Sequence, residues 1–186
     1  MARVGLDETA VVSAAAALAD AEGLERLTLA ALADRLGVRA PSLYGHVGGL
    51  ADLRVRLAIR GCHELRDALA LAAAGRAGGD ALRAVAGAYR DWARAHPGVY
   101  AAIGHAFASD PAAEAAAEGV ADVVFAVMRG YGLEDEDAVH GVRAVRAAVH
   151  GFITLEEQGG FRMAADPNVT WERLLTMLDR GLRGPS

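Results

Sequence analysis

The chain of 186 residues contains no lysine, and all of its 19 basic residues are arginine. This usage is mostly what a coding bias toward GC-rich codons produces, although arginine also suits contacts to phosphate. Aromatic residues make up only 5% of the chain, and sustained period-two alternation is missing. Because alanine and leucine dominate instead, the composition favours packed helices over a sheet. A hydrophobic content of 53% is enough to form a core.

Cysteine is also nearly absent, since Cys62 is the only one. No internal disulfide is therefore possible, and we interpret this residue as a small buried hydrophobe. No run of about 18 apolar residues is free of charge and glycine, so no membrane span is expected. The apolar stretch after Asp7 and Glu8 is not interpreted as a secretion signal, because two acidic residues precede it. We expect a cytoplasmic protein.

The net charge of −5 at first argues against a nucleic-acid partner. Its distribution is more informative than its total. Residues 1–62 contain seven arginines and seven acidic residues, whereas residues 63–186 contain twelve arginines and seventeen acidic residues. The N-terminal third is thus neutral and can present a local basic face to DNA.

Motifs of enzymes and metal proteins are missing. The sequence has no Cys-x-x-Cys, His-Glu-x-x-His, phosphate-binding loop or Gly-x-Ser-x-Gly. Asp137 and His140 have the spacing of helical di-iron ligands, but the second such motif that these sites need is absent. We therefore expect no enzyme, no catalytic residue, no metal site and no cofactor. A helical protein that binds a small molecule or a metal, without affinity for DNA, is the alternative.

Capping residues, glycines and prolines divide the chain into about nine expected helices. The expected ranges are 7–22, 29–36, 41–47, 50–74, 80–96, 99–107, 111–129, 134–157 and 170–182. The prediction is an all-α fold with a three-helix, helix-turn-helix domain over 1–50 and a helical ligand-binding and dimerisation domain over 51–186.

Residues 27–50, LTLAALADRLGVRAPSLYGHVGGL, contain two short helices joined by a turn with a glycine. The first has four apolar residues at i, i+3, i+4 and i+7 from Leu29, which form one stripe. In the second, Leu43 and Val47 point inward together, and the polar residues between them face outward or sideways. So short a helix is stable only when it packs. The arrangement is typical of a helix-turn-helix, whose second helix enters the major groove of DNA.

The segment resembles the DNA-binding domain of the TetR family of bacterial repressors over residues 7–60. The matching positions are Thr28, Ala33, Leu36, Gly37, Val38, Leu43, Tyr44, His46 and Val47. The resemblance implies that Thr28 and Tyr44 contact phosphates or bases and that His46 contacts a phosphate. It also implies a set of residues at the base edges. These are Arg39, Ala40, Pro41 and Ser42.

Alternatives exist for three of these residues. The sequence is also compatible with Tyr44 as the cap of a hydrophobic edge and with His46 as a surface histidine that contacts no DNA. Arg39 could contact a phosphate instead of a base, or make no contact with DNA. One departure from the family is clear, because Gly48-Gly49-Leu50 replaces a segment that usually carries a phosphate-binding lysine. Because one cation is lost, we expect the slope of the logarithm of the binding constant against the logarithm of the salt concentration to be shallower by about one unit.

The sequences HPGVYAAI (96–103) and HGFITLEEQGGF (150–161) are similar to the ligand-binding domain of the WHG-type subgroup of the family. Val149 stands where that subgroup often has an aromatic residue. The resemblance implies a regulator, with repression expected, that binds a palindromic operator as a homodimer and is released by a small-molecule effector. The candidate ligand residues are Tyr89, His96, Tyr100, Ile103, Phe107, Phe125, Met128, Arg146 and His150. Large aromatics at helical spacing are more often core residues, and this alternative stays open.

Two apolar seams near the C-terminus are candidates for the dimer interface. Their residues are Val142, Val145, Val149, Ile153, Trp171, Leu174, Leu175 and Leu178. The two helices would form half of a four-helix interface with a symmetry mate. The alternative is that the seams line only the core of one chain.

Overall fold

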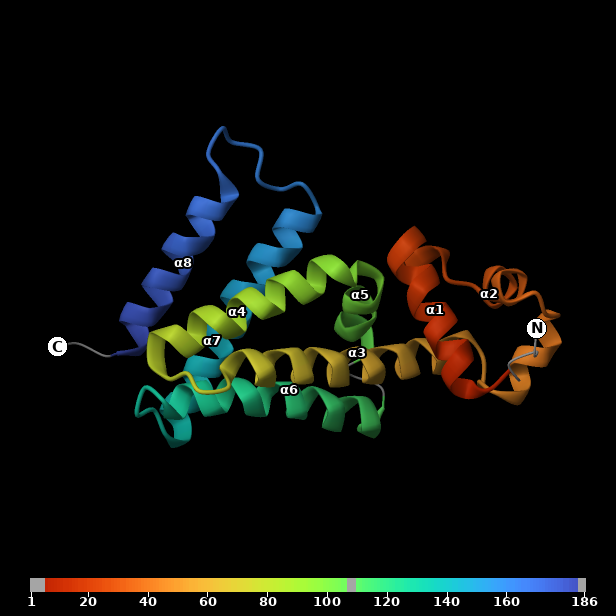
Figure 1. The fold of residues 1–186 in the computed structure, drawn as a ribbon, viewed down its shortest axis with the longest axis horizontal. Helices are drawn as coiled ribbons and strands as arrows, with labels where there is room; N and C mark the ends of the chain where they lie inside the picture. Colours follow the sequence, from red (N-terminus) through yellow and green to blue (C-terminus); the bar gives the residue numbers. More distant parts are fainter. Residues whose placement is uncertain (1–5, 107–109, 184–186) are drawn as a thin grey trace. The chain divides into compact units, whose positions relative to one another are not determined.

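The computed structural model describes residues 6–106 and 110–183, and these contain eight α-helices, two short 3-10 helices and no strand. The elements are α1 (Glu8–Glu22), η1 (Leu24–Arg26), α2 (Leu29–Leu36), η2 (Ala40–Gly45), α3 (Leu50–Ala73), α4 (Gly78–Ala95), α5 (Pro97–Ala106), α6 (Pro111–Arg129), α7 (Asp135–Glu157) and α8 (Pro167–Leu182) (Figure 1). The predicted all-α fold is confirmed. Within the described stretches, no helix has the length and apolarity that crossing a membrane requires.

Side chains cap the first turns of several helices. Asp7 accepts a hydrogen bond from the backbone N–H three residues later over 2.7 Å, and Thr28 accepts the equivalent bond over 3.1 Å. Both satisfy a donor that the first turn of a helix leaves free. Asp166 caps α8 by accepting from the N–H of Asn168 over 2.9 Å. Because Pro167 suits the first helical position, α8 begins there and not at Thr170, where the sequence analysis placed its start.

The third expected helix differs from the prediction in kind and in length. Residues 41–47 were expected to be helical, and the structure has a 3-10 helix over Ala40–Gly45. The N–H of Ser42 donates to the carbonyl of Arg39 over 2.9 Å, and the N–H of His46 donates to the carbonyl of Leu43 over 2.9 Å. These i to i+3 bonds suit short helical segments, and Gly45 weakens any longer α-helix. The short helix η1 was not predicted from the sequence either.

The contacts divide the chain into two compact units, and the first comprises residues 1–64 and 95–117. Its helices α1 and α2 pack together, and α5 packs against α1 and η1. Gly98 allows the closest approach, because a Cβ there would lie 2.1 Å from the carbonyl carbon and oxygen of Ala19. Asp20 then accepts hydrogen bonds from the N–H groups of Gly98 and Val99, each over 2.9 Å. The carboxylate of α1 thus caps the start of α5.

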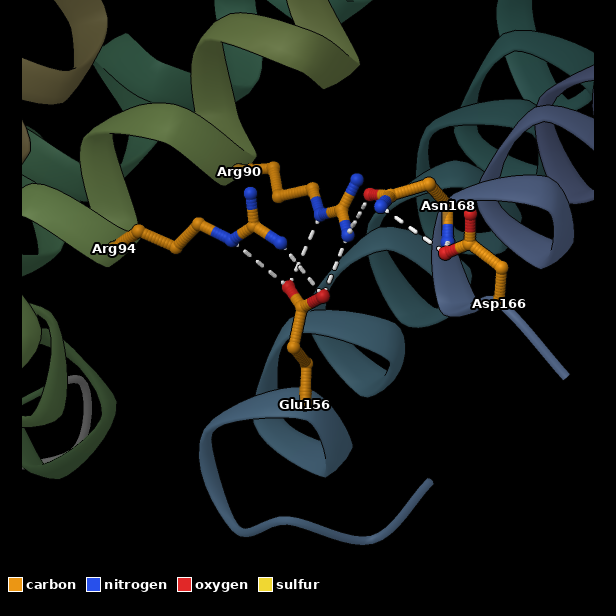
Figure 2. A network of polar contacts seen from close by, with 5 residues as sticks. All are labelled: Arg90, Arg94, Glu156, Asp166 and Asn168. Carbon is orange, nitrogen blue, oxygen red and sulfur yellow. Dashed lines mark hydrogen bonds and ion pairs between the residues drawn. The ribbon is translucent and has the colours of Figure 1, made fainter. Parts of the chain in front are cut away.

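The second unit comprises residues 65–94 and 118–186. In it α7 and α8 run antiparallel and are joined by the loop 158–166 (Figure 1). Arg90 and Arg94 of α4 converge on the carboxylate of Glu156 near the end of α7, and Arg90 also donates to the side chain of Asn168 in α8 (Figure 2). This network fastens α4 to both C-terminal helices.

Candidate nucleic-acid interface

The turn between α2 and η2 is fixed by backbone hydrogen bonds. Gly37 has a left-handed conformation with φ of 66°, which glycine adopts without strain. Its N–H donates to the carbonyl of Asp34 over 3.1 Å, and the N–H of Val38 donates to the carbonyl of Ala33 over 3.0 Å. This pair of bonds is a Schellman motif, and it sets the direction in which the chain enters η2.

One side of η2 is anchored in the first unit. Leu43 is 0% exposed and Val47 is 3% exposed, so the two apolar residues point inward as the sequence predicts. On the other side Tyr44 is 63% exposed, and Pro41 and Ser42 are exposed as well. Such a segment has no stability of its own, and its packing is what presents an outward surface.

The predicted DNA-binding residues lie around this surface. Arg39 is exposed immediately before η2, and Ala40 and His46 at its two ends are partly buried. Thr28 is exposed at the start of α2, where its hydroxyl oxygen accepts from the backbone N–H of Ala31. Six of the seven residues lie in the single stretch 39–46 of the chain, and Thr28 caps the start of the preceding helix. Their contacts with DNA stay a prediction.

A charged network lies where η2 leads into α3. Asp52 Oδ2 accepts the backbone N–H of Gly48 over 2.8 Å and the Nε–H of Arg56 over 2.7 Å. Arg56 also forms an ion pair with Glu8 in the first turn of α1. The hydrogen bond from Arg56 is the main cause that lowers the pKa of Asp52, and the bond from Gly48 adds to it. Asp52 is therefore an anion at neutral pH.

This network was not predicted from the sequence, although part of its signal is present there. Asp52 stands in the first turn of a helix that begins at Leu50, where a carboxylate commonly caps free backbone donors. The partner Glu8 is far away in the sequence, and no spacing rule connects it with Arg56.

The candidate ligand residues are divided between the two units. His96, Tyr100 and Ile103 belong to the first unit, where His96 Nδ1 lies 3.2 Å from the carboxylate of Asp20. The second unit contains Tyr89, Phe125, Met128, Arg146 and His150. Met128 is fully buried, whereas Arg146 and His150 are exposed. Phe107 lies outside the described residues. The assignment of these nine residues to an effector stays a prediction.

The second unit has a groove of about 530 Å³ between α3 and α6. Its lining residues are Arg66, Ala70, Ala73, Ala74, Gly119, Asp122, Val123 and Ala126. Most of these residues are small and apolar, and the lining offers one cation, Arg66, and one anion, Asp122. No candidate ligand residue is part of that lining.

The candidate dimer residues are mostly buried in one chain. Six of them are less than 9% exposed, namely Val142, Val145, Val149, Ile153, Trp171 and Leu175. Leu174 and Leu178 are partly exposed. The burial of these six residues agrees with the alternative that the seams line the core of one chain. The faces of α7 and α8 that remain open to a partner carry other residues, including Leu155 and Met177.

His140, which the sequence analysis paired with Asp137, lies on α7 close to another carboxylate. His140 Nε2 lies 3.6 Å from the carboxylate of Glu136, and both side chains are exposed. In residues 6–106 and 110–183, no group of three or more histidine, cysteine, aspartate or glutamate side chains is arranged to hold a metal ion.

The two short helical segments, the turn between them and the exposed side of η2 define a helix-turn-helix protein. Comparison with known proteins identifies the family. Residues 11–54 match the family described as bacterial regulatory proteins, tetR family, and residues 82–178 match the tetracyclin repressor-like C-terminal domain. The chain belongs to the TetR family of transcriptional regulators. These are regulators and not enzymes.

Two relatives and one solved structure illustrate the similarity. The uncharacterised HTH-type transcriptional regulator Rv0681 of Mycobacterium tuberculosis is 41% identical over 156 residues, which cover 83% of this chain and 72% of the relative. The uncharacterised HTH-type transcriptional regulator YobS of Bacillus subtilis is 36% identical over 166 residues, which cover 88% and 86%. A protein of unknown function from Rhodococcus sp. RHA1 has the same fold with a TM-score of 0.80, at 24% identity and 96% coverage of both chains.

Proposed function

We propose that this regulator binds a DNA operator through the outward side of η2 and its flanking residues. We call this the reading surface, and it comprises Thr28, Arg39, Ala40, Pro41, Ser42, Tyr44 and His46. The observation that carries the proposal is the contrast between the buried Leu43 and the exposed Tyr44 on one short segment. A segment held in this way can enter the major groove without unfolding anything around it.

The chemistry of the reading surface suggests a division of roles. Arg39 is the residue that can donate two hydrogen bonds to the O6 and N7 atoms of a guanine. Ala40 and Pro41 are apolar and suit the methyl group of a thymine, whereas Ser42 can bond to several bases. The hydroxyl of Tyr44 and the ring of His46 suit phosphate oxygens, which position the protein without reading sequence.

We further propose that two copies bind a palindromic operator. Symmetric helix-turn-helix dimers place their reading elements about 34–36 Å apart, one turn of DNA, so that the operator mirrors the twofold axis. The exposed sides of α7 and α8 support such a pair, because Leu155 is 48% and Met177 is 64% exposed there. Small exposed residues, including Ala144 and Ala147, would let two copies of α7 approach closely.

We assign DNA binding to residues 1–50 and effector binding and dimerisation to residues 51–186. In the proposed mechanism, an effector stabilises a spacing of the two reading surfaces that does not fit the operator. The protein, acting as a repressor, then dissociates from the DNA. Membership of the TetR family and the match of residues 82–178 to its C-terminal domain support this proposal. The effector in this mechanism is a small molecule.

Selection of duplexes from a random-sequence pool tests the function. We expect the protein to enrich a palindrome with half-site centres about one helical turn apart. Enrichment of no sequence would support the alternative of a helical small-molecule-binding protein without affinity for DNA. Once an operator is known, small molecules can be tested for their ability to dissociate the protein from it. Those that do so would identify the effector class.

A further inference from the structure

The end of η2 is fixed by a residue that is not on the reading surface. We propose that Asp52 is a positioning residue for operator recognition, which holds the turn after η2 in the orientation that reads sequence. The proposal rests on the proposed function of η2 in DNA binding. It assigns to Asp52 no contact with DNA.

The two ends of η2 are held in different ways. At its start, the Schellman motif around Gly37 fixes the chain by backbone bonds alone. At its end, the N–H of Gly48 donates to Asp52 Oδ2 over 2.8 Å, so that a side chain of α3 holds the turn. Because Gly49 has a φ of 118°, the chain changes direction at this point, and Asp52 fixes the residue just before the change.

Asp52 is itself held in place. Its Oδ2 also accepts from Arg56 one turn later in α3, and Arg56 is paired with Glu8 of α1. This arrangement restricts the carboxylate from two sides, and it joins the turn after η2 to both long helices of the first unit. A six-residue 3-10 helix cannot hold its own orientation, so these bonds contribute directly to where the outward side chains point.

A positioning role and a purely electrostatic role predict opposite signs. A carboxylate close to a DNA-binding surface repels phosphates, so removal of its charge should tighten binding to every duplex. If Asp52 orients η2, its removal should instead weaken binding to the operator, because base contacts depend on placement while phosphate attraction does not. The ratio of specific to non-specific affinity separates the two roles.

The experiment compares Asp52→Ala and Asp52→Asn with Asp34→Asn. Asp34 is exposed on α2, and its substitution removes the same charge from the same unit. Two probes are used, namely the duplex that the parent chain enriches from a random pool and a duplex of the same composition in shuffled order. Dissociation constants are measured by fluorescence anisotropy at one fixed salt concentration.

For Asp52→Ala we expect the Kd for the enriched duplex to rise about tenfold, comparable to one mismatched base pair. The Kd for the shuffled duplex should stay the same or fall. Asp52→Asn keeps an oxygen that can accept from Gly48, so it should retain most of the selectivity. Asp34→Asn should leave the ratio of the two constants unchanged. Faster exchange of the Gly48 amide hydrogen in Asp52→Ala, with other protected amides unaffected, would support the local effect.

Four outcomes would overturn the proposal. Tighter binding of Asp52→Ala to both duplexes would show that the carboxylate acts only as a charge. Equal weakening on both duplexes, in Asp52→Asn as well, would show a general loss of structure. Failure of the parent to enrich any sequence would overturn the proposed function and this inference together, whereas enrichment with an unchanged ratio in Asp52→Ala would overturn this inference alone.

Discussion

Arg90 and Glu156 form an ion pair with two parallel hydrogen bonds, Nε to Oε2 over 3.0 Å and Nη2 to Oε1 over 2.5 Å. Arg90 is 6% exposed, and its guanidinium lies 5.1 Å from the ring centroid of Phe152 and 5.0 Å from that of Trp171. Arg94 binds the same carboxylate over 3.0 and 2.7 Å. One glutamate thus neutralises a buried arginine and connects α4 with α7, which makes it a critical residue for the second unit.

We predict that this pair makes the second unit sensitive to acid. Hydrogen bonds from Arg90, assisted by Arg94 and opposed by burial, lower the pKa of Glu156 from 4.5 to about 2. Between these values the unfolded chain binds a proton that the folded chain does not, so the free energy of unfolding falls as the pH falls through this window. Above pH 4.5 the contribution is complete. Urea unfolding at neutral pH and near pH 3 measures the difference.

Glu156→Gln should lower the free energy of unfolding at neutral pH by on the order of 3 kcal/mol, because it leaves Arg90 charged and buried without its counterion. It should also flatten the acid dependence. Glu157→Gln is the matched control. Burial and the neighbouring Glu156 raise the pKa of Glu157, so its ionised form is not stabilised by folding. Equal effects of the two substitutions would contradict the special role of Glu156.

Gly98 provides a second test of stability, in the first unit. A methyl group at this position would lie 2.1 Å from the backbone of Ala19, so Gly98→Ala must displace α5 from α1. We expect a loss of about 2 kcal/mol or more in the free energy of unfolding. Gly104, in the same helix, has nothing within 4 Å of a Cβ. Gly104→Ala should therefore stabilise the helix by about 0.5–1 kcal/mol, and thermal unfolding of both variants distinguishes the two environments.

The sequence was sufficient for those elements whose causes are local. Thr28, Gly37 and the pair Leu43 and Val47 were identified from capping and spacing, because each acts on residues within a few positions of itself. The 3-10 form of η2 was missed, since the α and 3-10 forms of so short a segment differ by little and the surrounding packing decides between them.

Sequence patterns failed where distant residues meet. Arg90 and Glu156 are separated by 66 positions, and no periodicity connects them. The apolar seams of α7 and α8 were recognised, but a stripe on a helix does not say whether its own chain or a second copy covers it. Val145 and Leu175 are buried in one chain, and the burial of the seam is therefore a result of tertiary packing.

Arg39 and Tyr44 should have different effects on DNA binding. We expect Arg39→Ala to change the sequence preference at one position of each half-site, at a cost of about 1–3 kcal/mol on the preferred base. Tyr44→Phe should weaken binding to all sequences alike, by about 1 kcal/mol, because it removes one hydrogen bond. Selection from random duplexes with each variant gives the comparison.

Arg76→Ala is the control for charge in that experiment, since Arg76 is exposed in the second unit and far in the sequence from η2. It should change neither the preference nor, beyond a small electrostatic effect, the affinity. If Arg39→Ala and Tyr44→Phe both bound every duplex as the parent does, the assignment of η2 to the groove would be wrong.

Met177 tests whether the exposed side of α8 is the dimer interface. It is 64% exposed in one chain, and an apolar side chain at this level gains by burial against a second copy. Met177→Glu should place an unpaired charge in that interface and weaken association by at least about a hundredfold. Leu71→Glu makes the same change at the exposed Leu71 of α3 and should leave association unchanged. Sedimentation equilibrium of both variants over a range of concentrations measures the effect, and a parent-like mass for Met177→Glu would exclude this face from the interface.

Since a palindromic operator gains affinity from two reading surfaces held together, the same variant should also lose most of its affinity for the full operator while its affinity for a half-site is retained.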